Sequence, residues 1–195
     1  LTAKGFAISR IAKLALTELE ELLGTLAKGT PRPKPTATTE PEAKVNAMLL
    51  DRMVVALEQF RLRELSAQLA VARVHCSVAD FVYHIILPLI GRIGMLVNEE
   101  KLWVAHEHAL SAIVKTHIYQ SIYSLSSTRD AGVERVGPSI CVATQEGDYH
   151  EFGILLASLL LQSRGVNTHF FGCNMPAKSL ADAANAIGSS VVLVG

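Results

Sequence analysis

Hydrophobic and polar positions divide the chain into segments with different patterns. Residues 1–28 space their apolar side chains for one helical face or for two short helices. Residues 29–41 hold four of the seven prolines and few side chains that could pack together. That composition is typical of a linker that tends towards polyproline II.

Residues 42–127 follow a helical pattern throughout. The pattern predicts four helices, at 42–57, 61–72, 78–97 and 100–124. Because the connections between them are short, neighbouring helices should be antiparallel, and we expect a four-helix bundle. Pro88 lies inside the third helix and is expected to kink it.

The pattern changes over residues 136–195, where short β-branched runs alternate with helical stretches. SICVAT, VNTHFF and VVLVG are the predicted strands, and the two helices between them end at Gly165 and Gly188. This alternation predicts a parallel, doubly wound, Rossmann-like sheet. Such sheets usually have about five or six strands. Since only three strands are visible and the first segment begins within a pattern, we expect a fragment of a multidomain α and α/β protein.

Composition excludes several classes of protein. Lys and Arg number 18, as do Asp and Glu, so the chain as a whole predicts no electrostatic grip on nucleic acid. Residues 1–35 alone have a small basic excess, six Lys and Arg against three Glu. The three cysteines are far apart, which indicates a reducing cytoplasm without disulfides. No apolar run of about 18 residues occurs, so we expect no membrane-spanning segment.

The loop after the first predicted strand, Gln145–Phe152, contains the candidate chemistry. It has neither a G-x-G-x-x-G spacing nor the lysine of a P-loop, so it does not predict phosphate binding. Asp148 lies two residues before His150, and a carboxylate can hold one ring N–H while the other nitrogen binds a metal. One histidine cannot complete a protein metal site, because structural zinc needs four protein ligands. The metal should therefore arrive with its other ligands, as in a macrocycle.

The residues DYHEFG match a D-x-H-x-x-G signature, and the segment resembles the cobalamin-binding domains of corrinoid proteins, methionine synthase and cobalamin-dependent mutases. The resemblance implies that His150 is the lower axial ligand of cobalt and that Asp148 is its hydrogen-bond partner. Gly153 would leave room for the displaced nucleotide tail. The stretch GVNTHFFGCNMP resembles the second strand and loop of these domains, and a helical bundle in front of the sheet is their usual arrangement.

A second resemblance lies in the last predicted helix. Light-sensing regulators of the MerR type carry a W-x9-EH motif and bind adenosylcobalamin, and Glu107 and His108 align with its EH. By this resemblance Glu107, His108 and position 97 would face the upper side of the cofactor. Val97 replaces the tryptophan and Asn98 the histidine that commonly follows it, which predicts a weak or absent photoresponse. Trp103 is displaced by six positions and is interpreted as a core aromatic.

The opening residues GFAISRIAKLALTELEELL resemble the end of a MerR-type winged helix-turn-helix domain. The combined resemblance implies a cytoplasmic, cobalamin-binding transcriptional regulator and not an enzyme. It would be a homo-oligomer that binds operator DNA through its N-terminal domain and responds to cobalamin, with light as a further signal. Two alternatives stay open. A corrinoid methyl carrier uses the same bundle and signature, and a cofactor-free interaction module would leave His150 an ordinary surface residue.

Overall fold

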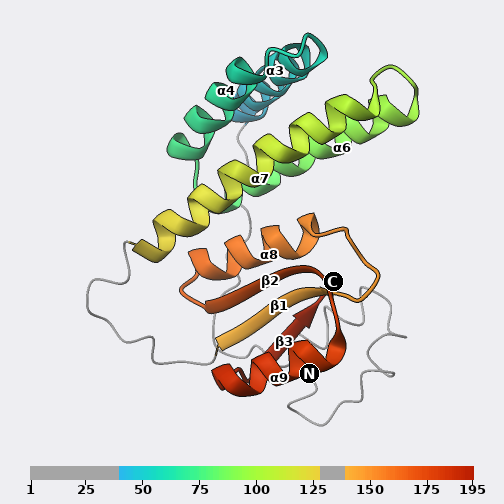
Figure 1. Ribbon diagram of the computed structural model, residues 1–195. Coiled ribbons are helices and arrows are strands. Elements are labelled where there is room, and N and C mark those ends of the chain that lie inside the picture. Colours follow the sequence, from blue (N-terminus) through green and yellow to red (C-terminus); the bar gives the residue numbers. More distant parts are fainter. Residues whose placement is uncertain (1–39, 128–138) are drawn as a thin grey trace. The chain divides into compact units, whose positions relative to one another are not determined.

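The computed structural model describes residues 40–127 and 139–195 (Figure 1). The expected DNA-binding remnant at 1–28 and nearly all of the expected linker lie outside these residues. Four helical segments make up the first described part. They are α3 (Glu40–Glu58), α4 (Leu62–His75), the continuous run of α5 (Val78–Asp80), η2 (Phe81–Ile86) and α6 (Leu87–Asn98), and α7 (Val104–Ser127). The four predicted helices are therefore present, each within a few residues of its expected bounds.

The α3–α4 and α6–α7 turns both use a residue in the left-handed region. Phe60 has φ 50° and Glu100 has φ 57°. In each turn the next residue donates its N–H to a carbonyl five positions back, Arg61 to Ala56 at 2.8 Å and Lys101 to Leu96 at 2.9 Å. Glycine usually fills this position, since other residues pay roughly 1–2 kcal/mol for the conformation. Here Phe60 and Glu100 occupy it, so no glycine in the sequence marks either turn.

A π-helical segment accommodates Pro88. Proline lacks the N–H for an intrahelical bond and its ring crowds the carbonyl four residues earlier. In the structure, η2 directly precedes α6, and the Leu87 N–H bonds to the Val82 carbonyl, five residues back. The wider turn changes the hydrogen-bond register just before the proline, and the helix continues to Asn98.

The helix that contains Pro88 is also the most apolar long helix among the described residues. By length and composition alone, residues 78–98 could cross a membrane. The sequence pattern does not indicate such a span, because Asp80, His84 and Arg92 interrupt its apolar run. Its side chains Phe81, Ile85 and Leu89 are fully or almost fully buried against those of the other bundle helices. This packing is typical of the core helix of a bundle.

The second described part is a three-stranded parallel sheet in the order β2-β1-β3. Its elements are β1 (Ser139–Gln145), α8 (Phe152–Ser163), β2 (Asn167–Met175), α9 (Ala177–Ile187) and β3 (Val191–Val194). Figure 1 shows α8 and α9 on opposite sides of the sheet. Gly165 (φ 88°) and Gly188 (φ 70°) follow the two helices in the left-handed conformation, as predicted. The predicted α and α/β fold class is confirmed for the described residues.

The sheet places one loop at a topological switch point. From β1 the chain moves to β2 on one side, and from β2 it crosses to β3 on the other side of β1. Ligands of open α/β sheets bind outside the carboxyl end of the strands at such a point. The β1–α8 loop leaves from this end. β2 runs four residues past its predicted end, with register shifts opposite Ala143 and φ 82° at Gly172.

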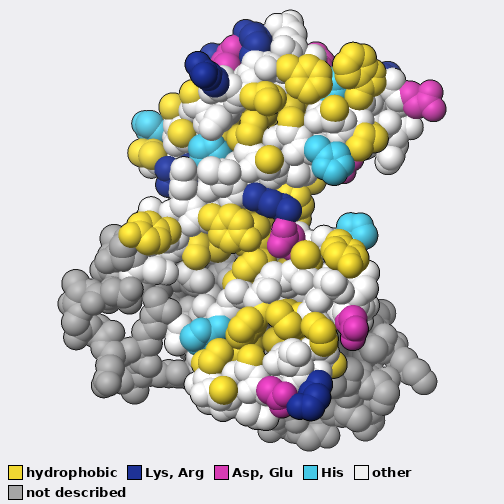
Figure 2. All heavy atoms as spheres, viewed as in Figure 1, with side chains coloured by type: hydrophobic (Ala, Val, Ile, Leu, Met, Phe, Trp, Pro, Cys, Tyr) yellow, Lys and Arg dark blue, Asp and Glu magenta, His cyan; other side chains and the backbone are white. Residues whose placement is uncertain are grey.

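Helix α8 joins the sheet to the bundle through a shared core. Its side chains Leu155 and Leu159 are fully buried in the same cluster as the bundle residues. A smaller cluster on the other side of the sheet contains Cys141, Ala143 and two residues of α9. On the face that Figure 2 shows, charges of both signs are scattered between hydrophobic side chains, without a broad patch of one sign.

Candidate functional site

The β1–α8 loop begins with a turn that requires glycine. Gly147 has φ 86°, a conformation that side chains with a Cβ rarely adopt. The turn is closed by a hydrogen bond from the Asp148 N–H to the Gln145 carbonyl at 3.1 Å. The turn therefore brings Asp148 back beside the end of β1.

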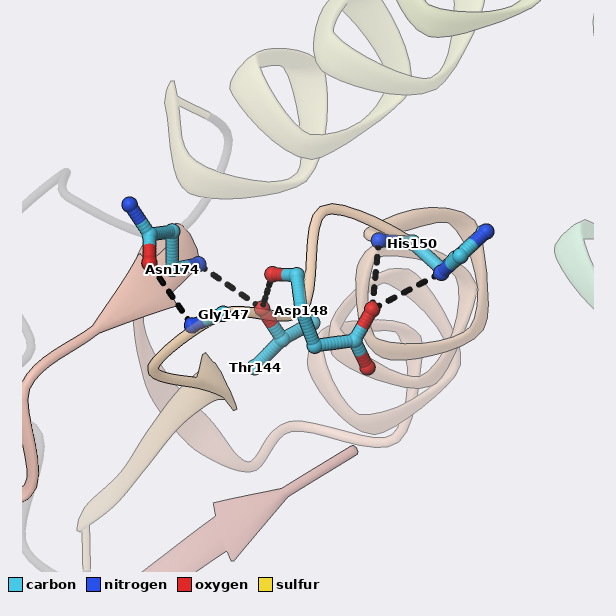
Figure 3. Close-up of polar contacts among 5 residues, drawn as sticks. All are labelled: Thr144, Gly147, Asp148, His150 and Asn174. Atoms are coloured by element: carbon cyan, nitrogen blue, oxygen red, sulfur yellow. Dashed lines mark hydrogen bonds and ion pairs between the residues drawn. The ribbon is translucent and has the colours of Figure 1, made fainter.

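A buried threonine fixes the loop from below (Figure 3). Thr144 is fully buried, and its hydroxyl donates to the Asp148 carbonyl at 2.5 Å and accepts the Asn174 N–H at 2.9 Å. The Asn174 side chain in turn accepts the Gly147 N–H at 2.8 Å. Asn174 has φ 56°, which asparagine tolerates better than most residues. Sequence reasoning missed both residues, and the only signal was an asparagine in the NMP stretch that follows the predicted second strand.

Asp148 orients His150 directly. One carboxylate oxygen, Oδ1, accepts the His150 backbone N–H at 2.8 Å and also lies 2.9 Å from the ring nitrogen Nδ1. These hydrogen bonds, from the backbone and then from the ring, hold the pKa of Asp148 below its usual range. A carboxylate can only accept, so Nδ1 carries the proton in this pair and Nε2 of a neutral ring keeps its lone pair.

The imidazole is oriented and also accessible. The side chain of His150 is 98% exposed, whereas that of Asp148 is 26% exposed. No hydrogen-bond partner for Nε2 is recorded among the described residues, and Figure 3 shows the ring pointing away from the threonine network. An exposed nitrogen with its lone pair free and its tautomer fixed is suited to ligate a metal.

Residues 40–127 and 139–195 contain no group of three or more His, Cys, Asp or Glu side chains able to hold an ion. Gly153 faces open space, since a Cβ added there would meet nothing within 4 Å. At Gly195, in contrast, a Cβ would lie 2.4 Å from Ile154 Cγ2. The end of β3 therefore approaches the first turn of α8 closely, and glycine permits this.

The structure does not bring the predicted upper-face residues into contact with the loop. Glu107 and His108 are exposed near the beginning of α7. Val97 is half-buried and packs against the bundle core. Trp103 is 70% exposed, so its interpretation as a core aromatic is wrong. It lies in the turn before α7, beside Phe60 and His106, with ring centroids 6.3 and 5.4 Å away.

Helix α7 nevertheless touches the loop one residue beyond His150. Lys115 Nζ lies 2.5 Å from Glu151 Oε1 and 5.5 Å from the centroid of the Phe152 ring. His108 precedes Lys115 by seven residues, about two helical turns or 10 Å, and so projects from the same side of α7. Sequence reasoning missed this contact, because nothing in the spacing of residues 115 and 151 indicates that they meet.

A cavity of about 420 Å³ lies elsewhere on the bundle. It is bounded by the α3–α4 and α6–α7 turns, and its lining residues are Glu58, Gln59, Phe60, Lys101, Leu102, Trp103 and His106. None of the predicted cofactor residues lines it. Trp103 is twelve residues before Lys115, or about 18 Å along a helix, so this cavity is separate from the β1–α8 loop.

Comparison with curated proteins identifies relatives over almost the whole chain, although no protein-family model matches it. The chain is 26% identical to the HTH-type transcriptional repressor CarA of Myxococcus xanthus, over 95% of the chain and 59% of that protein. It is 29% identical to the HTH-type transcriptional repressor CarH of the same organism, over 96% of the chain and 58% of the relative. A shorter match, 28% identity over 52% of the chain and 46% of the relative, is to dimethylamine corrinoid protein 1 of Methanosarcina mazei.

The chain thus spans somewhat under 60% of the length of the two repressors. Among solved structures, a cobalamin-binding protein of Desulfitobacterium hafniense aligns at 13% identity and TM-score 0.31, over 82% of the chain and 65% of that protein. The methanol:cobalamin methyltransferase complex MtaBC of Methanosarcina barkeri aligns at 16% identity and TM-score 0.34, over 93% of the chain and 69% of that structure. The curated relatives confirm the resemblance to helix-turn-helix regulators that the sequence analysis stated.

Proposed function

We propose that this chain is the cofactor-binding part of a cobalamin-dependent transcriptional regulator, in which His150 is the lower axial ligand. The relatives that match nearly all of the chain are named transcriptional repressors, which favours a regulator over an enzyme. Relatives that match about half of it are named corrinoid proteins, which favours a corrinoid as the ligand. The relatives, the fold and the loop chemistry thus support the same proposal.

The observation that carries the proposal is the exposed imidazole held by a carboxylate, Asp148 Oδ1 to His150 Nδ1 at 2.9 Å. Bound cobalamin would supply a cobalt ion whose lower position is open to one protein nitrogen. The Nδ1 proton of His150 is donated to Asp148, so Nε2 is directed outwards with its lone pair available to the metal. The Thr144 and Asn174 hydrogen bonds hold the loop in place, so little ordering is needed when His150 binds. Gly153 would leave the beginning of α8 open for the tail.

The upper side of the cofactor would be covered by α7 and the end of α6. His108 lies on the same side of α7 as Lys115, which contacts the loop, and Glu107 is its neighbour. Val97 offers no aromatic ring to an adenosyl group and already packs into the bundle. We therefore expect any cobalamin form to bind, with a weak response to light compared with a tryptophan-bearing relative.

Regulation would proceed through assembly. Cobalamin bound between the bundle and the sheet would change which helix surfaces are available for contact with other subunits. A changed homo-oligomer alters the spacing of paired DNA-binding domains, and operator affinity depends on that spacing. The DNA-binding surface would include residues 1–28, in a cytoplasmic protein.

Visible spectra of the full-length gene product, incubated with hydroxocobalamin or with adenosylcobalamin, test the proposal. After free ligand is removed by gel filtration, wild type should keep a red cofactor whose visible spectrum differs from that of the free form. His150→Ala should lose the cofactor or return the free-form spectrum. His75→Ala is the control, because His75 is exposed on α4 and bonds to its own helix at Val71. A colourless wild type would contradict cobalamin binding and favour the interaction module.

A corrinoid methyl carrier is the second candidate, and the matches to dimethylamine corrinoid proteins favour it. Both candidates bind cobalamin, so the spectrum cannot separate them. Binding to DNA from the promoter of the protein's own gene can, in a gel-shift assay with and without cofactor. A regulator should shift this DNA in a cobalamin-dependent way, whereas a carrier should not shift it in either state.

A further inference from the structure

We propose that Lys115 and Glu151 form a latch that transmits the state of His150 to helix α7, an inference that rests on the proposed cobalamin function. The two charged groups lie 2.5 Å apart. The Glu151 side chain is only 15% exposed and that of Lys115 is 36% exposed, so water screens this pair less than a surface pair. The ammonium also lies over the Phe152 ring, at 5.5 Å from its centroid.

The backbone connects Glu151 directly to His150. A shift of the His150 backbone must therefore move Glu151, because consecutive Cα atoms stay 3.8 Å apart. It is the N-cap residue of α8, and its carbonyl accepts the Leu155 N–H at 2.9 Å. Its side chain makes no cap hydrogen bond to α8. The carboxylate reaches α7 instead, and it therefore links the histidine loop to the bundle.

A second contact, one turn further along α7, does not involve the loop. Tyr119 meets Phe170 of β2 edge to face, with ring centroids 6.3 Å apart. Burial and then the negative charge of Glu151 raise the pKa of Tyr119, so the carboxylate acts on both residues of this α7 face. The aromatic contact can stay in place when the loop moves, whereas the ion pair cannot. Tyr119 would serve as the pivot and Lys115 as the part that is released.

The consequence lies two turns before Lys115. A helix transmits a tilt along its length as a nearly rigid rod, and His108 projects from the same side as Lys115, about 10 Å away. A shift of the His150 backbone on cofactor binding, with the ring still held by Asp148, would move Glu151 and change its hold on Lys115. The tilt of α7 about Tyr119 then repositions Glu107 and His108 over the site. Lys115 and Glu151 are thus positioning residues and do not bind the cofactor.

Hydrogen–deuterium exchange of the full-length gene product, with and without hydroxocobalamin, tests the latch. In wild type, the amides of α7 around residues 111–120 should exchange at different rates in the two states. Lys115→Met keeps an apolar stem over Phe152 but removes the charge, and should reduce this ligand-dependent difference about fivefold or more. Its visible spectrum should stay that of wild type. Lys178→Met is the matched control, because Lys178 pairs with Asp182 on the exposed surface of α9.

The reversed pair, Lys115→Glu with Glu151→Lys, separates the latch from a mere loss of packing. It should restore most of the ligand response that either single reversal abolishes. If wild type retains no cobalamin, both this inference and the proposed function fail. If wild type is red but Lys115→Met keeps the full exchange response of α7, the latch alone is overturned. The same holds if the reversed pair responds no better than the single variants.

Discussion

The two sides of the proposed cofactor site are built differently. The β1–α8 loop is organised by a chain of hydrogen bonds from the buried Thr144 through Asp148 to His150. On α7, Glu107 and His108 are exposed, and no hydrogen bond of either side chain is recorded among the described residues. A metal-binding side chain that is already held in place loses little conformational entropy on binding, whereas exposed side chains must be ordered by the cofactor itself. The lower ligand should therefore be fixed by the fold, and the upper side should adapt to what is bound.

The largest expected effect is a difference between two histidines. His150→Ala should weaken hydroxocobalamin binding by more than about 100-fold, because it removes the metal ligand itself and not an outer-shell partner. His108→Ala should cost far less, since its side chain is unorganised before the cofactor binds. Equilibrium dialysis against both variants measures the two losses. Equal losses of affinity in the two variants would contradict the proposed difference between the two sides of the site.

Asp148→Asn should weaken binding by about 10–100-fold, the usual effect of removing an outer-shell partner of a metal-bound histidine. The amide oxygen can still accept hydrogen bonds but carries no charge to favour the Nδ1 proton. Asp182→Asn on α9 is a control that changes the same atoms outside the site. If dialysis gave Asp148→Asn the affinity of wild type, Asp148 would have no part in orienting the ligand.

Thr144→Val should lower the free energy of unfolding by about 1–3 kcal/mol, because the buried hydroxyl both donates to Asp148 and accepts from Asn174. Thr116→Val is the matched control, since the Thr116 hydroxyl bonds to its own helix on an exposed face. Urea unfolding measures both variants. A loss at Thr144 no larger than the control's would mean that the loop does not depend on this threonine.

The smallest expected effect lies within the bundle, away from the cofactor. Burial, and then the charge of Arg73, lower the pKa of His117, whose Nε2 bonds to Ser66 at 3.0 Å. The unfolded chain then binds a proton more readily than the folded one. Stability should be full above about pH 6.5 and should fall on acidification from there down to the lowered pKa.

The slope that His117 adds cannot exceed about 1.4 kcal/mol per pH unit. His117→Gln should flatten the pH dependence of the unfolding free energy between pH 7 and pH 5 relative to wild type. If the variant and wild type gave the same profile, His117 would not be the titrating group.

Much of this fold could be predicted from local pattern. The helical period, the β-branched runs and the glycines at 165 and 188 each report a preference of the backbone nearby. The Asp–x–His spacing likewise predicted a pair that the structure shows in contact. Such signals depend on neighbours in sequence, and one chain displays them without an alignment.

The remaining features depend on residues far apart in the chain. Asn174 meets the loop across 27 positions and Lys115 meets Glu151 across 36, and neither pair has a sequence spacing that would reveal it. The prediction for Trp103 was wrong for a different reason. Aromatic rings in apolar stretches are usually buried, but its turn exposes it, and only tertiary packing decides which case applies.

Electron paramagnetic resonance of the cob(II)alamin form tests the central claim most directly. A nitrogen bound below cobalt splits the signal, and the pattern differs between ¹⁴N and ¹⁵N because their nuclear spins differ. If His150 is the lower ligand, protein labelled with ¹⁵N-histidine should change a triplet splitting into a doublet, and His150→Ala should abolish the change. A splitting that is unaffected by histidine labelling would place the cofactor's own base below cobalt and contradict the account.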